Sequence, residues 1–183
     1  MPMSTAREIF VHELSDTLSA ENIIYKMLGQ VVKETKLPPA QEAYQHHLDE
    51  TKQHISNVEA AFKAIGEKPE KTTCLAADGL SKEHAALKEE KPKDHALELG
   101  LLGGAGKTEH YEIASYKLLV QMAKDLGETK AAALLQENLD QELAMSKTVE
   151  KLAKMVSADA RKAVSATMQK PATAGARKTP IAA

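Results

Sequence analysis

Six residues with metal-ligating side chains fall on the apolar faces of predicted helices. Each face is a stripe of residues spaced three or four apart, apolar at both ends and interrupted by an acid near its middle. Glu50 and His54 are four residues apart, and Glu109 and Glu112 are three apart, so each pair shares one helix face. A carboxylate buried among aliphatic side chains is costly unless a cation compensates it. The six residues are Glu21, Glu50, His54, Glu109, Glu112 and Glu142.

A divalent metal is the most economical cation for this set, because no Lys or Arg falls on the stripes. Glutamate oxygens suit Fe or Mn, and histidine nitrogen suits Fe, Mn or Zn. Four helices that each offer a ligand match the arrangement of di-metal bundles. We therefore expect two metal ions, with Fe the first candidate and Mn or Zn as alternatives. Glu50, Glu109 and Glu142 are the candidates for bridging two ions.

Each of these residues also has a structural interpretation. A single glutamate on such a stripe often packs its stem while its carboxylate reaches water, and a single histidine is often only hydrogen-bonded. The coincidence of four interrupted stripes favours the metal. His47, one turn before Glu50, is open to two roles, an outer-shell partner or a packing residue.

The elements that would position these side chains are long helices. Ser4 or Thr5 can cap the first, with Glu8 in its first turn, and Gly66 stands where the second should end. The connection between the second and third long helices spans some 30 residues, too long for a hairpin, which indicates a ferritin-like crossover. The predicted fold is all-α, a ferritin-like four-helix bundle with a short extra helix in that crossover. Long helices are expected at 4–36, 39–65, 94–126 and 128–156, the last able to fray onward to Met168, and the short helix at 75–90.

Composition supports one helical domain. Of 183 residues, 43% are hydrophobic but only 3% aromatic, so the core is built from Ala, Leu, Ile, Val and Met. The single Cys74 excludes an internal disulfide framework and fits a reducing compartment. The sequence shows neither a secretory signal nor an apolar run long enough to span a membrane, so we expect a cytoplasmic protein without membrane contact. The net charge of -2 argues against a protein that binds polyanions with its whole surface.

The last segment differs from the rest. We expect a bundle over 1–156 and a basic, disordered tail over 157–183, which has almost nothing to bury. A solvated tail is the favoured interpretation, and contact with nucleic acid through its bases is the alternative. The bases are Arg161, Lys162, Lys170, Arg177 and Lys178, against one acid, Asp159.

The run GLLGGAGKT (100–108) invites comparison with a phosphate-binding loop. That motif needs glycine at position 101, which is Leu101, and a preceding strand, which the pattern does not predict. We place the run inside the third long helix. Its glycines would then allow close helix approach, at a cost of ~1 kcal/mol each in helix propensity.

Several segments resemble the bacterial ferritin-like stress proteins of the YciF/YciE type, a family known as a domain of unknown function. They are IFVHELSDTLSAENII (9–24), HLDETKQHI (47–55), CLAADGL (74–80), EHYEIASYKLL (109–119) and LLQENLDQEL (134–143). The resemblance implies a dimeric helical bundle with a di-metal centre like that of rubrerythrins, and the same six candidate ligands. Ser146 stands where relatives often have Asp, and Met145 where ferritins have the His of Glu-x-x-His.

Two functions follow from this combination. The first is a di-metal carboxylate protein that handles iron, O2 or peroxide in a stress response, with a redox partner that the sequence does not identify. The second is a non-catalytic dimeric stress-response scaffold with a structural or vestigial metal site. The departures at Ser146 and Met145 favour the second, and the interrupted stripes favour the first. Whether the protein is an enzyme is left open by the residues.

Overall fold

Five helices form the computed structural model, which describes residues 3–168, with side chains to residue 163. The described residues contain no strand, as predicted. The predicted helix ends agree with the observed ones to within two residues, except that α5 continues to Met168. The helices are α1 (Ala6–Glu34), α2 (Pro38–Ile65), α3 (Leu75–Glu89), α4 (Asp94–Asp125) and α5 (Thr129–Met168).

Local signals explain where these helices begin and end. Thr5 caps α1, and its side chain and that of Glu8 form a capping box. α2 begins at Pro38, because proline is well tolerated in the first turn of a helix. Gly66 ends α2 in the left-handed conformation, with φ of 74°. These caps set the lengths of the two helices that carry half of the candidate ligands.

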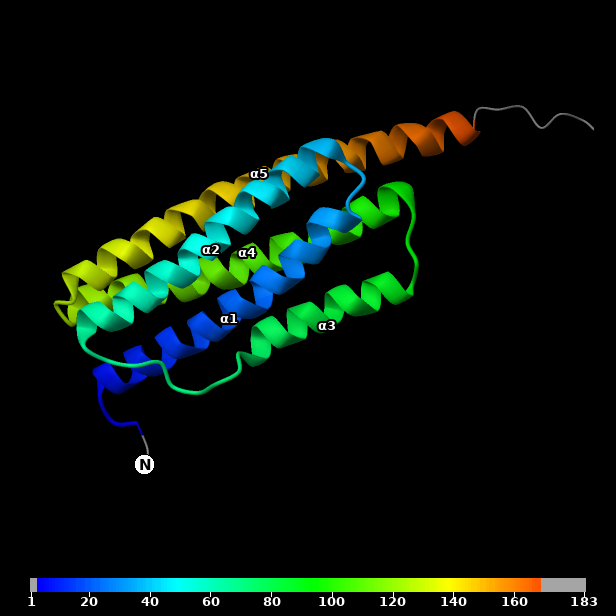
Figure 1. Cartoon of the computed structure of the whole chain (residues 1–183). Helices are drawn as coiled ribbons and strands as arrows, with labels where there is room; N and C mark the ends of the chain where they lie inside the picture. Colours follow the sequence, from blue (N-terminus) through cyan, green and yellow to red (C-terminus); the bar gives the residue numbers. More distant parts are fainter. Residues whose placement is uncertain (1–2, 169–183) are drawn as a thin grey trace, which may run out of the picture.

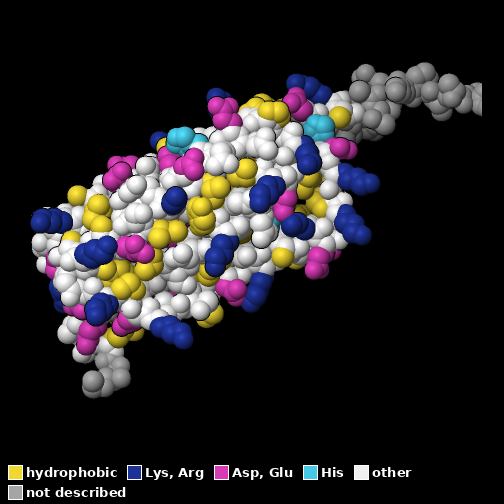
Figure 2. Space-filling view, in the orientation of Figure 1, with side chains coloured by type: hydrophobic (Ala, Val, Ile, Leu, Met, Phe, Trp, Pro, Cys, Tyr) yellow, Lys and Arg dark blue, Asp and Glu magenta, His cyan; other side chains and the backbone are white. Residues whose placement is uncertain are grey.

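The four long helices lie side by side, and α3 lies along α1 and α4 (Figure 1). From the end of α2 the chain runs back along the bundle through α3 before α4 begins, so α2 and α4 point the same way (Figure 1). This is the long crossover that was predicted. On the face shown in Figure 2, hydrophobic side chains form small groups among acidic and basic ones. None of the described helices combines the length and apolarity that a membrane span requires.

The glycine run of α4 departs from expectation. A Cβ at Gly100 would lie 2.8 Å from Leu87 Cδ2. At this position α4 therefore lies close to a side chain of α3, as predicted for the glycines. A Cβ at Gly103 or Gly104 would meet nothing within 4 Å. Close helix approach is therefore the wrong explanation for these two glycines, which face open space instead.

The predicted tail lies only partly within the described chain. α5 continues past Val156, and residues 169–183 lie outside the described residues. The domain boundary at 156, the disorder of the tail and its contact with nucleic acid therefore stay predictions.

Candidate metal centre

A polar layer crosses the bundle between two apolar clusters. On α1, Glu21 lies between Leu14 of one cluster and Leu28 of the other. On α5, Glu142 likewise lies between Leu139 and Met145. The same order holds on α2 and α4, where the layer is formed by histidines and glutamates. The candidate ligands therefore lie at one level of the bundle, as a shared site requires.

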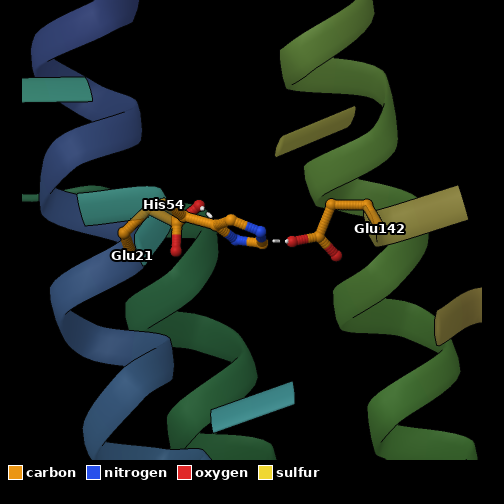
Figure 3. Close-up of side chains that lie close together, drawn as sticks. All are labelled: Glu21, His54 and Glu142. Atoms are coloured by element: carbon orange, nitrogen blue, oxygen red, sulfur yellow. Dashed lines mark ion pairs between the residues drawn. The ribbon is translucent and has the colours of Figure 1, made fainter. Parts of the chain in front are cut away.

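The first group of ligand atoms comes from α1, α2 and α5. His54 Nδ1 lies 3.1 Å from Glu142 Oε1 and 3.5 Å from Glu21 Oε1. All three side chains are fully buried. Figure 3 shows them pointing toward one another across the bundle. Their ligand atoms lie within 4.8 Å of one another, close enough to hold one metal ion.

The second group comes from α2, α4 and α5. His47 Nε2 lies 3.6 Å from Glu109 Oε1 and 3.6 Å from Glu142 Oε2. These three residues are buried and also form a group able to hold an ion. Glu142 belongs to both groups, with Oε1 toward the first and Oε2 toward the second. A carboxylate placed in this way can bridge two ions.

The ligand atoms are buried and face one another across the layer. Glu142 Oε1 and Oε2, His47 Nε2 and His54 Nδ1 are held only by the ion-pair contacts given above, with no further hydrogen-bond partner. Glu98, a buried glutamate outside the layer, is different, because Thr35 Oγ1 and Lys36 N each donate to it at 2.6 Å. Buried polar atoms are normally satisfied in this way. The donor set in the layer therefore fits a metal ion as its missing partner.

Protons partly balance the charge of these carboxylates. Burial and the neighbouring Glu142 raise the pKa values of Glu109 and Glu112 well above the usual range. Burial acts to lower the pKa of His54, but Glu142 and Glu21 outweigh it and raise that pKa to about 10. The metal-free layer thus has an organic cation, the imidazolium of His54. This cation was not expected from the sequence, because the apolar stripes carry no Lys or Arg and a histidine with its ordinary pKa is mostly neutral at neutral pH.

Two acceptors orient the histidines toward the layer. His47 Nδ1 donates to Glu50 Oε2 at 3.0 Å, and this contact helps to lower the pKa of Glu50 against the opposing effect of burial. His54 Nε2 donates to Gln141 Oε1 at 2.7 Å. In each ring the other nitrogen faces the glutamates. Outer acceptors of this kind hold metal-ligating histidines in the required orientation.

A chain of hydrogen bonds from α4, α5 and α2 fixes Glu21. The Tyr116 hydroxyl donates to Glu21 Oε1 in a short hydrogen bond. Asn138 Nδ2 lies 3.0 Å from the Tyr116 oxygen, to which it donates, and 3.3 Å from the backbone oxygen of His54. Asn57 Nδ2 in turn donates to Asn138 Oδ1 at 2.7 Å. Glu21 is thus fixed by a buried network that also contacts the backbone of the α2 ligand.

Comparison with known proteins places the chain in a family. Residues 5–163 match the model of the domain of unknown function DUF892. The chain belongs to this family. Protein YciF of Escherichia coli K12 is a relative of this chain. The two are 36% identical over 145 residues, which cover 79% of this chain and 87% of YciF.

Solved structures agree with this DUF892 assignment. The crystal structure of the E. coli stress protein YciF matches with a TM-score of 0.82 and 34% identity, covering 84% of this chain and 98% of that one. YcfI from Rhodopseudomonas palustris matches with a TM-score of 0.75 and 31% identity, covering 80% and 94%. The ferritin-like helical bundle and the resemblance stated from the sequence are therefore confirmed.

The structure brings together most, but not all, of the predicted ligands of this DUF892 protein. Glu21, His54, Glu109 and Glu142 lie in the two groups. Glu112 is buried beside them, with Oε2 unpartnered, yet belongs to neither group. Glu50 lies behind His47 and also contacts His46 Nδ1 at 3.4 Å. Its role as a ligand stays a prediction, whereas Glu142 is shared by both groups.

One residue of the layer was undervalued from the sequence, and the two departures on α5 add no carboxylate or imidazole to it. His47 is a member of the second group, although it was open between packing and outer-shell roles. Its spacing of seven residues from His54, two helical turns on one face, was the available signal. Met145 packs in an apolar cluster, and buried Ser146 offers no carboxylate.

Proposed function

We propose that this protein is a di-metal carboxylate protein that handles iron together with O2 or peroxide in a stress response. The observation that carries the proposal is Glu142, which is fully buried and whose two oxygens face different groups of ligand atoms. E. coli YciF, to which the chain is similar, is described as a stress protein. Iron suits a set of carboxylates with two imidazoles, and Mn or Zn are the alternatives.

Glu21, His54 and Glu142 would hold one ion, and His47, Glu109 and Glu142 the other. A pair of redox-active ions held there would supply electron-transfer chemistry toward O2 or peroxide. The side chains around the ions would hold them in place and hold protons close to them. Glu112 is a buried acid beside the ligands, and burial and Glu142 raise its pKa, which favours its protonated form.

Metal content tests the proposal first. Metal-free protein is supplied with Fe(II) without oxygen, or with Mn(II), and bound metal is measured after removal of the excess. We expect about two ions per chain, because there are two groups of ligands. Glu142→Gln should lose metal, since the amide carries no negative charge and keeps only one of the two oxygens that the groups share. Glu137→Gln, the same change at an exposed position of α5, is the matched control and should retain both ions.

A result of less than about half an ion per chain, unchanged in Glu142→Gln, would refute a metal centre, because a site of this composition binds firmly once its protons leave. Oxygen consumption and peroxide turnover are then measured in the loaded protein. Turnover that is lost in His54→Gln, with the fold intact by circular dichroism, supports redox chemistry.

The second candidate is a non-catalytic scaffold with a structural metal. It is favoured by Met145 and Ser146, which provide no ligand on α5 beyond Glu142. In this case the loaded protein is more stable than the metal-free protein but consumes neither O2 nor peroxide. The two candidates thus differ in turnover and agree in metal content.

A homodimer, implied by the resemblance, is proposed for either candidate. Sedimentation of the full chain measures it directly, and a concentration-independent monomer would contradict it.

A further inference from the structure

A cavity of about 530 Å³ lies among α1, α3 and α4 and reaches the polar layer. Most of its wall is aliphatic, with Leu28 and Val31 from α1, Leu87 from α3 and Leu101 from α4. His47 and Glu109, two members of the second group of ligand atoms, line the same cavity. Cavities of about 300–1,000 Å³ with apolar walls and a few polar groups are typical of small-molecule sites.

The glycines of α4 account for part of this space. Gly103 and Gly104 line the cavity, and a Cβ at either position would meet nothing within 4 Å. They lie in the interior of a helix, where glycine is unfavourable, and their backbone does not have the positive φ that would require it. Their effect in the structure is to leave room beside α4.

The inner end of the cavity contains polar atoms without partners. Tyr44 is fully buried and lines the cavity, and its hydroxyl makes no hydrogen bond. Glu109 Oε2 is likewise buried and unpartnered. A ligand hydroxyl can accept a hydrogen bond from the Tyr44 hydroxyl and donate one to Glu109 Oε2. A small polar group of this kind would therefore satisfy both atoms.

We propose that the cavity binds an uncharged aliphatic molecule with one hydroxyl or hydroperoxyl end, its chain along the aliphatic wall and its polar end at Tyr44 and Glu109. A carboxylate end is disfavoured, because the polar end would lie against Glu109, and Lys107, the lysine of the cavity wall, is already paired with Glu83. Assignment of this molecule as a substrate rests on the proposed function, whereas its binding does not.

Helix α3 forms one wall of the cavity. Lys107 Nζ of α4 lies 2.5 Å from Glu83 Oε2 of α3, and His84 Nε2 of α3 lies 3.0 Å from Glu34 Oε2 of α1. Within α3 itself, only Ala77 is buried. The aliphatic chain would thus lie beside a helix that makes ion pairs to both α1 and α4.

Binding of decan-1-ol to the metal-free full-length protein tests this proposal. Saturation-transfer NMR titrations give the affinity, with decanoate as the charged counterpart. We expect saturable binding of decan-1-ol and at least about tenfold weaker binding of decanoate. Gly104→Leu should weaken decan-1-ol binding by at least about tenfold, because the new side chain occupies the cavity. Gly29→Leu is the matched control, since that glycine also has empty space but does not line the cavity.

A second variant keeps the test decisive if Gly104→Leu does not fold. Tyr44→Phe removes only the hydroxyl and should weaken decan-1-ol binding by about threefold to tenfold, the worth of one hydrogen bond. Absence of saturable binding to the wild type would overturn the proposal. So would decanoate binding as tightly as decan-1-ol, or both cavity variants binding as the wild type does. Because no metal is present, these outcomes are independent of the metal-content test.

Discussion

The metal-free protein should lose stability as the pH rises above neutrality, because His54 holds its proton more tightly in the folded state. An imidazole in the unfolded chain has a pKa of about 6.5. In the folded protein burial opposes the charge, but Glu142 and Glu21 raise the pKa of His54 to about 10. The stabilising contribution is fully present below the unfolded value and is lost as the pH rises through the folded value.

The size of this loss of stability follows from the one extra proton that the folded state binds. Between the two pKa values the folded state binds about one more proton than the unfolded state, so the free energy of unfolding falls by about 1.4 kcal/mol per pH unit. From about pH 7.5 to about pH 9 the loss is about 2 kcal/mol. Any proton that Glu109 or Glu112 retains in this interval acts in the same direction, because burial and Glu142 raise both pKa values.

Urea denaturation of chelator-treated protein, followed by circular dichroism at both pH values, measures this loss. In His54→Gln the titrating imidazole is gone, and the dependence on pH should become shallower by about 1.4 kcal/mol per pH unit. Protein saturated with Mn(II) should lose less stability, since metal binds more tightly when its ligands are deprotonated. A wild-type stability that is flat or rises over this interval would refute the assigned protonation of His54.

Two further predictions concern single side chains. Gly103→Ala should raise the free energy of unfolding by up to about 1 kcal/mol, because a methyl group there meets nothing within 4 Å. Gly100→Ala should raise it by less, because its Cβ would lie 2.8 Å from Leu87 Cδ2 and the leucine side chain must shift. Equal changes in urea denaturation would contradict this. Tyr116→Phe removes the donor to Glu21 and should weaken metal binding about tenfold to a hundredfold without removing a ligand; an affinity equal to that of the wild type, by competition with a chelating dye, would show that this hydrogen bond does not matter.

The fold could be predicted because its signals are local. Thr5 with Glu8, Pro38 and Gly66 act on the backbone within one turn, so their effect can be deduced from neighbouring residues. The crossover required only the count of residues between the second and third long helices. The level of the polar layer also followed from sequence, since Glu21 and Glu142 interrupt their stripes near the middle.

The arrangement within the site could not be predicted, because it depends on how each helix is rotated about its axis. His47 and Glu50 lie three residues apart on one face of α2, and spacing alone cannot decide which of them points inward. The structure turns His47 toward Glu109 and leaves Glu50 behind it. The charge balance was also incomplete, because a histidine becomes a cation only when carboxylates from other helices surround it. The open space at Gly104 depends in turn on the position of α3.

Anomalous X-ray diffraction at the Fe and Mn absorption edges, on a crystal of the metal-loaded protein, tests the central claim most directly. The account predicts two peaks in the polar layer, one among Glu21, His54 and Glu142 and the other among His47, Glu109 and Glu142. An empty layer in a crystal whose protein was supplied with both metals would contradict it, as would peaks confined to carboxylates on the surface.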